Sequence, residues 1–168
     1  MEQDQIGCVL IPSRVFNNDH PGHMTVRFFH FQRELAYRGF YFDPSDLPDD
    51  CRSSRQFRQF LLANRIPGHI INDLLFAERC EAFGDHVLTH VVAIHAQNVI
   101  ETISPSEARR SGWYSFNPDN FEDCHNCVTW AVDIINQAHG KVVLSRPHQG
   151  WIREMVKLLS AMQSTRAE

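Results

Sequence analysis

A cysteine at the start of an expected helix is the position in this chain best suited to covalent chemistry. Cys127 follows a polar segment, residues 117–126, and precedes apolar residues at helical spacing: Val128, Ala131, Val132 and Ile135. The first N–H groups of a helix lack intrahelical partners and the helix dipole is positive there, so a thiolate is favoured over a thiol. The sequence therefore predicts that Cys127 is a nucleophile.

A nucleophilic thiol needs a base beside it, and the chain offers ten histidines. His23 follows a Pro-Gly pair and opens the first strand of an expected hairpin, which would place its ring at a sheet end, facing a helix start. His90 is a second candidate for the base. It lies in the strand-like run 87–94, and Glu101 follows as a possible polar partner. A histidine inside an apolar strand is as often a hydrogen-bonded core residue, so we assign the base to His23 and keep His90 as the alternative.

A third residue would orient the imidazole, and the sequence does not identify it. Glu34, Asp43 and Asp46 are near enough to His23 in sequence to serve. Each is equally well explained as a surface carboxylate, so none is assigned.

The surrounding segments predict an α+β fold. Strand-like runs at residues 8–11, 24–31 and 35–42 indicate an N-terminal antiparallel sheet, with a turn near residues 32–34. Ser53 or Ser54 can cap a helix that Pro67-Gly68 would end, and the nucleophile helix should run over 127–138 and stop at Gly140. Further segments favour a strand at 87–94, a helix at 96–103, a short strand at 113–116 and a final amphipathic helix at 151–162.

Length and composition describe one ordinary domain. A chain of 168 residues with 43% hydrophobic content can bury a core without disulfide bonds or metal ions, so we expect a single domain over residues 1–168. The net charge of -4 gives no reason to propose a nucleic-acid or anionic-membrane partner, and no apolar run is long enough to span a bilayer. Five cysteines, an odd number, favour a reducing compartment. With no signal-peptide pattern, we expect a cytoplasmic protein or an effector exported without a cleaved signal.

Two segments together resemble a known family. They are Gly22-His23-Met24-Thr25-Val26, followed by Tyr37-Arg38-Gly39-Phe40-Tyr41, and Asn126-Cys127-Val128-Thr129-Trp130-Ala131 much later. This order, His before Cys, resembles circularly permuted papain-like cysteine enzymes, a group with relatives of the NlpC-type peptidases, the lecithin:retinol acyltransferase-like enzymes and bacterial toxins or effectors. The resemblance covers about residues 20–140. It implies a papain-like sheet packed on the nucleophile helix, Cys127 as nucleophile and His23 as base.

Such a pair would carry out acyl transfer. The Cys127 sulfur would attack a carbonyl carbon, and the acyl-enzyme would pass to water or to an amine. A protein, peptide or acyl substrate is therefore expected, with no cofactor, and the sequence leaves peptidase, amidase, deamidase and acyltransferase open.

Two other classes remain open. Cys124 and Cys127 form a C-x-x-C pair that Cys80, Cys51 or His139 might complete as a zinc site. In a non-catalytic interaction domain, Cys127 would instead be a small buried apolar residue.

Overall fold

One curled sheet carries most of the architecture. The computed structural model describes residues 5–11, 23–30, 33–73, 87–92, 96–105, 110–142 and 144–146. Within these ranges the strand order is β5-β1-β2-β3-β4-β6-β7. The strands are β1 (Gln5–Ile11), β2 (His23–His30), β3 (Arg33–Phe42), β4 (Ile66–Asn72), β5 (Val87–Val92), β6 (Trp113–Tyr114) and β7 (Cys124–His125). Neighbouring strands are antiparallel except for the parallel pair β6–β7.

The predicted N-terminal antiparallel sheet is confirmed. β2 and β3 form the expected hairpin, with Val26 opposite Arg38 and Phe28 opposite Ala36, and β1 pairs along the other edge of β2. Alternation along β2 puts Met24, Val26 and Phe28 in the core, each at most 1% exposed.

The strand β4 was not predicted. Pro67-Gly68 was expected to end a helix, but α1 (Ser54–Ala63) ends earlier and the pair lies inside β4. Pro67 pairs with Trp113 of the two-residue strand β6. Because this strand forms few ladder hydrogen bonds, the missing N–H of proline costs little there. A Cβ atom at Gly68 would lie 2.2 Å from the Phe40 ring, so the absence of a side chain lets β3 and β4 pack closely.

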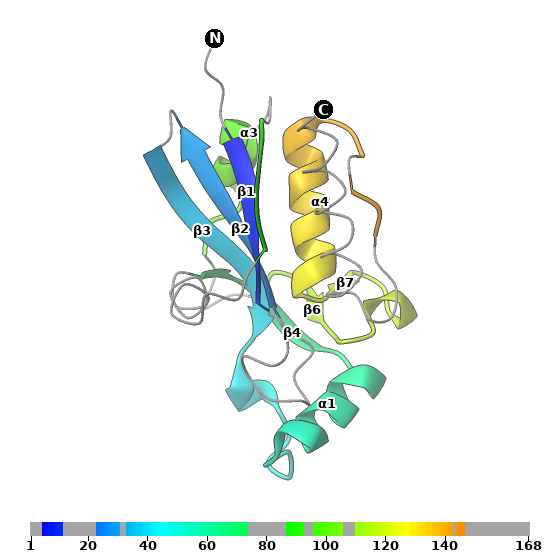
Figure 1. Ribbon diagram of the computed structural model, residues 1–168. Helices are drawn as coiled ribbons and strands as arrows, with labels where there is room; N and C mark the ends of the chain where they lie inside the picture. Colours follow the sequence, from blue (N-terminus) through cyan, green and yellow to red (C-terminus); the bar gives the residue numbers. More distant parts are fainter. Residues whose placement is uncertain are drawn as a thin grey trace.

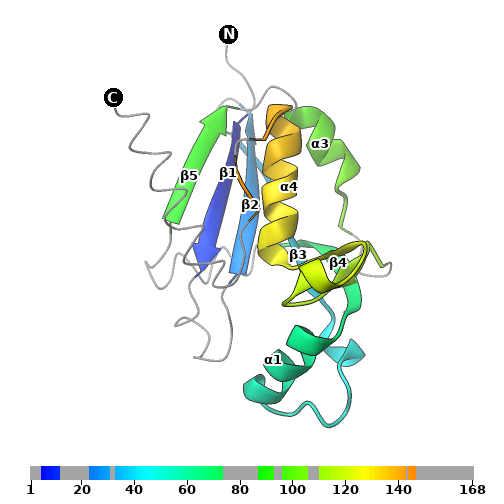
Figure 2. The ribbon, with the colours of Figure 1, turned by 90° about the vertical axis from the view of Figure 1, so that its right-hand side faces the viewer.

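The helix α4 (Cys127–His139) packs against β2 and β3, with α3 (Ala96–Thr102) beside it (Figures 1 and 2). Its apolar residues complete the core, and the Trp130 ring stacks on Phe40 at 6.0 Å. Gly140 ends the helix in the left-handed conformation, with φ of 70°, as predicted. The strands β6 and β7 lie at the N-terminal end of α4 (Figure 1).

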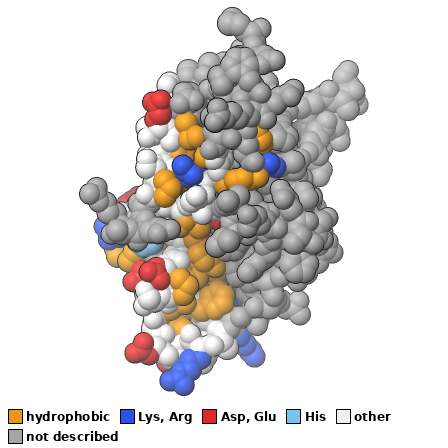
Figure 3. Space-filling view, turned by 90° about the vertical axis from the view of Figure 1, so that its left-hand side faces the viewer, with side chains coloured by type: hydrophobic (Ala, Val, Ile, Leu, Met, Phe, Trp, Pro, Cys, Tyr) orange, Lys and Arg blue, Asp and Glu red, His pale blue; other side chains and the backbone are white. Residues whose placement is uncertain are grey.

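A lobe formed by residues 43–63 projects below this end of the molecule (Figure 1). It contains the short helix η2 (Pro44–Asp46) and α1, which Ser53 and Gln56 cap reciprocally. The Leu61 carbonyl anchors the lobe by accepting hydrogen bonds from the Phe116 N–H (2.9 Å) and the Ser115 hydroxyl (2.7 Å). On the side of the molecule where β3 lies, hydrophobic side chains run among scattered charges, and acidic and basic groups both stand at the lower end (Figure 3).

Two expectations concern residues beyond this description. The final helix at 151–162 lies outside the described residues, and the single domain over 1–168 stays a prediction. Among the helices that the structure describes, none has the length and apolar character needed to cross a membrane.

Candidate functional site

Cys127 is the first residue of α4 and is completely buried, with 0% of its surface exposed. Asn126 caps the helix: its side-chain oxygen accepts from the N–H groups of Val128 (3.0 Å) and Thr129 (2.8 Å). The Thr129 hydroxyl accepts from the Asn126 N–H in return, at 3.0 Å. This reciprocal cap fixes the turn that carries the sulfur, and it uses the amides that follow Cys127.

His23 meets Cys127, so the structure brings together the two residues that the sequence singled out. His23 is the first residue of β2 and is 0% exposed. The Cys127 side chain lies close enough to its ring to contribute to the raised pKa of His23. The strand start and the helix start therefore place an imidazole and a thiol in contact, within a region closed to solvent.

Asp73, which the sequence analysis did not identify, holds the other side of the imidazole. The His23 Nε2 atom lies 2.6 Å from Asp73 Oδ2, and both side chains are fully buried. The Thr25 hydroxyl donates to the same oxygen at 2.7 Å. Because Nε2 faces the carboxylate, Nδ1 is the ring nitrogen left to face the sulfur.

The carboxylates considered from the sequence lie elsewhere. Asp43 is exposed and accepts a hydrogen bond from the Ser45 N–H at 2.9 Å. Asp46 lies 3.9 Å from His69 rather than beside His23. The side chain of Glu34 is outside the described residues.

The approach of Asp73 depends on Gly39. Continuing the β2–β3 register puts Thr25 opposite Gly39, and Asp73 directly follows β4 on the other side of β3. A Cβ atom at position 39 would lie 2.0 Å from Asp73 Oδ2, so only glycine lets the carboxylate cross β3 to reach His23. An isolated glycine in a strand signals such a close approach, and Gly39 was the available clue to Asp73.

Electrostatics favour a cationic His23. Burial alone would lower the pKa of His23, but the Asp73 carboxylate and the Cys127 sulfur outweigh it through charge and hydrogen bonds and raise the pKa from 6.5 to about 10. The imidazole is therefore protonated at neutral pH. A cationic imidazole beside a cysteine is a group that can stabilise a thiolate.

Tyr114 is a further neighbour of the sulfur that the sequence analysis missed. Tyr114 is 1% exposed, and both the side chain and the backbone N–H of Cys127 lie close enough to its phenol group to influence its pKa. Burial first, and the nearby Cys127 and Tyr41 groups second, raise the pKa of Tyr114 well above its usual value of 10. The group therefore stays a neutral hydroxyl, able to donate a hydrogen bond.

Tyr41 covers the pair from the partly exposed side. Its ring makes edge-on contacts with His23 (centroids 5.5 Å apart) and Tyr114 (5.7 Å), and it stacks on Phe42 at 4.4 Å. Tyr41 keeps some solvent exposure, whereas His23 and Tyr114 have almost none. It is therefore the aromatic contact of the base that lies nearest to solvent.

The competing base His90 lies in a different part of the sheet. Its strand β5 pairs with β1, with Gly7 opposite His90, and β1 separates β5 from β2. Its side chain is outside the described residues, so the structure places only its backbone.

The zinc ligand set does not assemble among the described residues. There, no group of three or more His, Cys, Asp or Glu side chains could hold a metal ion. Cys127 and His139 stand at opposite ends of α4, about 18 Å apart at 1.5 Å per residue, too far to share one ion. Cys80 is outside the description.

Comparisons of this chain with protein-family models, with curated proteins and with solved structures gave no match.

Proposed function

We propose that this protein is a thiol-dependent hydrolase or acyltransferase that acts on an amide or ester through Cys127 and His23. The observation that carries the proposal is the buried chain of contacts from Cys127 through His23 to Asp73. A nucleophile, a base and a residue that orients the base are the elements of thiol catalysis. The His-before-Cys order and the sheet packed on the nucleophile helix support a permuted papain-like fold, which is part of the same proposal.

The reaction begins from the imidazolium–thiolate pair. The Cys127 sulfur adds to the carbonyl carbon, and a C–S bond forms as the carbonyl electrons move to oxygen. Collapse of this intermediate breaks the bond to the leaving amine or alcohol, which takes the proton from His23. The neutral imidazole then removes a proton from water or an acceptor amine, whose attack on the thioester releases the acyl group and restores the thiolate.

Two donors are available for the developing oxyanion. The Cys127 N–H and the Tyr114 hydroxyl lie close together, and the substrate oxygen would replace the phenol oxygen as the acceptor of the N–H. The next two amides of α4 donate to the Asn126 side chain, so they are not available to bind the oxyanion. One donor of this kind contributes about 3 kcal/mol to the transition state. Asp73 has a positioning role: it holds Nε2 and keeps the ring cationic.

The proposal is tested with an activated ester, because the natural acyl donor is not identified. Incubation with p-nitrophenyl acetate should release p-nitrophenol in a burst and leave an acetyl group on Cys127, located by peptide mass spectrometry. The Cys127→Ser protein is the control for the site, and His23→Gln is the control for activation. Acetylation of Cys124 or of surface lysines at the same rate as Cys127 would overturn the proposal and favour a non-catalytic domain.

A further inference from the structure

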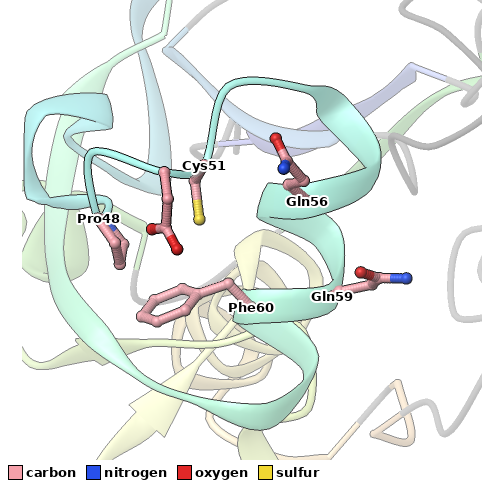
Figure 4. A pocket seen from close by; sticks show the side chains of 6 residues that line it. Pro48, Cys51, Gln56, Gln59 and Phe60 are labelled. Carbon is pink, nitrogen blue, oxygen red and sulfur yellow. The ribbon is translucent and has the colours of Figure 1, made fainter.

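A pocket of about 360 Å³ opens on the lobe of residues 43–63, and no residue of the candidate site lines it. Its walls are formed by Pro48, Asp50, Cys51, Gln56, Gln59 and Phe60. The first three come from the turn before α1, and the others come from α1 itself. Figure 4 shows the Cys51 sulfur and the Phe60 ring directed into the space beside Pro48.

The pocket contains a carboxylate that the described residues do not neutralise. Asp50 is exposed, and within the described part of the chain its side chain has neither an ion pair nor a hydrogen bond; only its backbone carbonyl is used, by the Arg52 N–H at 3.0 Å. Burial and the Asp50 charge both raise the pKa of the Cys51 thiol. Cys51 therefore stays neutral, and Asp50 supplies the charge of the pocket.

The remaining walls suit a long flexible side chain. Gln56 is held in place because its Oε1 atom accepts from the N–H groups of Arg52 (2.9 Å) and Ser53 (3.0 Å), and Gln59 lies one turn further along the same helix face. Phe60 and Pro48 provide apolar surface. An aromatic face beside a carboxylate attracts cations and methylene groups and offers nothing to an anion.

The charge around the pocket favours the same kind of ligand. Asp43, Asp46, Asp49 and Asp50 all fall within residues 43–50. The arginines of this region, Arg52, Arg55 and Arg58, are exposed, and none of them lines the pocket. A cationic group entering beside Asp50 would meet a carboxylate with which no described side chain is paired.

We propose that this pocket binds the side chain of an arginine or lysine in a peptide or protein partner. The methylene groups pack against Pro48 and Phe60, and the cation pairs with Asp50. The site is separate from the thiol chemistry and does not depend on it. If the catalytic proposal also holds, a basic residue in the substrate would dock on the lobe while the acyl group reaches Cys127.

The test uses small amides that carry one side chain each. Nα-acetyl-arginine methylamide and Nα-acetyl-lysine methylamide should cause saturable NMR shifts at the pocket residues of the full-length Cys127→Ser protein, with dissociation constants of about 1–10 mM, as expected for so few contacts. The norleucine and glutamate analogues should not saturate. Asp50→Asn should weaken arginine binding about two- to fivefold, which is the loss expected when an ion pair with an exposed carboxylate is removed.

The matched control is Asp49→Asn, which changes the neighbouring exposed carboxylate that does not line the pocket and should leave binding intact. Equal binding of arginine and norleucine amides would overturn the proposal, as would equal losses in the two variants or no saturable shift. Because the sulfur is absent from the protein used, these outcomes are independent of the catalytic proposal. A fold change in Asp50→Asn would appear as shifts throughout the spectrum and would be checked by its melting temperature.

Discussion

Cys127 and Cys124 are both buried, but their surroundings differ. The two cysteines are 0% and 4% exposed. Cys127 faces His23 and Tyr114, whereas burial raises the pKa of Cys124 to about 11, with Asp123 adding to the rise and Arg65 and Arg146 opposing it. Burial by itself therefore keeps a thiol protonated and inert. The region around Cys127 differs in having a base whose own positive charge is maintained by a buried carboxylate.

Replacing each cysteine in turn should give the largest effect. Cys127→Ser should abolish burst release of p-nitrophenol, because a serine hydroxyl is far less acidic than a thiol and a His23 that is already protonated cannot remove its proton. Cys124→Ser should keep most of the activity and the melting temperature. A Cys124→Ser protein that loses activity together with bound zinc, measured by elemental analysis, would contradict the comparison and favour a metal site.

The Asp73 carboxylate should control how the reactivity of the thiol depends on pH. A raised His23 pKa means that the imidazolium persists up to about pH 10 and is lost above it. Without the charge of Asp73, burial opposes the imidazolium with only Cys127 against it, so the pKa of His23 should fall and the pair should be lost at lower pH. If the proposed pair holds the sulfur as a thiolate, Asp73→Asn should label with iodoacetamide at pH 6.5 about 100-fold or more slowly than the wild type, because even an unburied thiol with a pKa of about 8.5 is only about 1% ionised at that pH.

The difference between the two proteins should shrink as pH rises, because an ordinary thiol ionises on its own there. Cys124 in the same sample is the internal reference. Parallel pH profiles for the wild type and Asp73→Asn would show that the carboxylate does not act through His23.

Two glycines allow a paired test of the close approach at the site. Gly39→Ala puts a Cβ against Asp73, and Gly68→Ala puts one against the Phe40 ring, at similar predicted distances of 2.0 and 2.2 Å. Both should lower stability by about 1–3 kcal/mol through overpacking, measured by urea unfolding. Only Gly39→Ala should also slow Cys127 labelling at pH 6.5, because it moves the carboxylate from His23. Equal labelling rates in the two variants would show that Gly39 is not needed for Asp73 to act on His23.

The smallest effect on Cys127 labelling is expected for the Thr25 hydroxyl. Thr25→Val keeps the shape and removes one hydrogen bond to a buried carboxylate, Asp73, at a cost of about 1.5–3 kcal/mol in unfolding free energy. Labelling of Cys127 should slow a few-fold, since the carboxylate keeps its bond to His23. Thr102→Val removes the bond from an exposed hydroxyl to the Val99 carbonyl on α3, and it should cost about 0.5 kcal/mol or less without changing the labelling rate.

The helix with its nucleophile and the strand with its base could be predicted because their signals are local. Asn126 and Gly140 delimit α4 in the sequence itself, and His23 stands at the start of an aromatic β run. Asp73 could not be predicted in this way. It reaches His23 only through the pairing of β4 with β3, and β4 begins with Ile66-Pro67-Gly68, which favours a turn.

The contact between Tyr114 and Cys127 could not be predicted from local sequence either. The short strand around Tyr114 was predicted, and β6 confirms it, but the Tyr114 hydroxyl meets Cys127 only after β6 and β7 pair at the start of α4. Contacts between segments distant in the chain carry no periodicity that a local pattern can detect.

The complete burial of the Cys127 sulfur also affects how fast this cysteine is inactivated by oxidation. Thiolates in contact with solvent are oxidised by peroxide to sulfenic acid and then to higher acids that cells do not generally repair. With 0% of Cys127 exposed, an oxidant and a substrate must wait for the same local opening. The fraction of time spent open therefore sets both the working rate and the useful lifetime of each molecule.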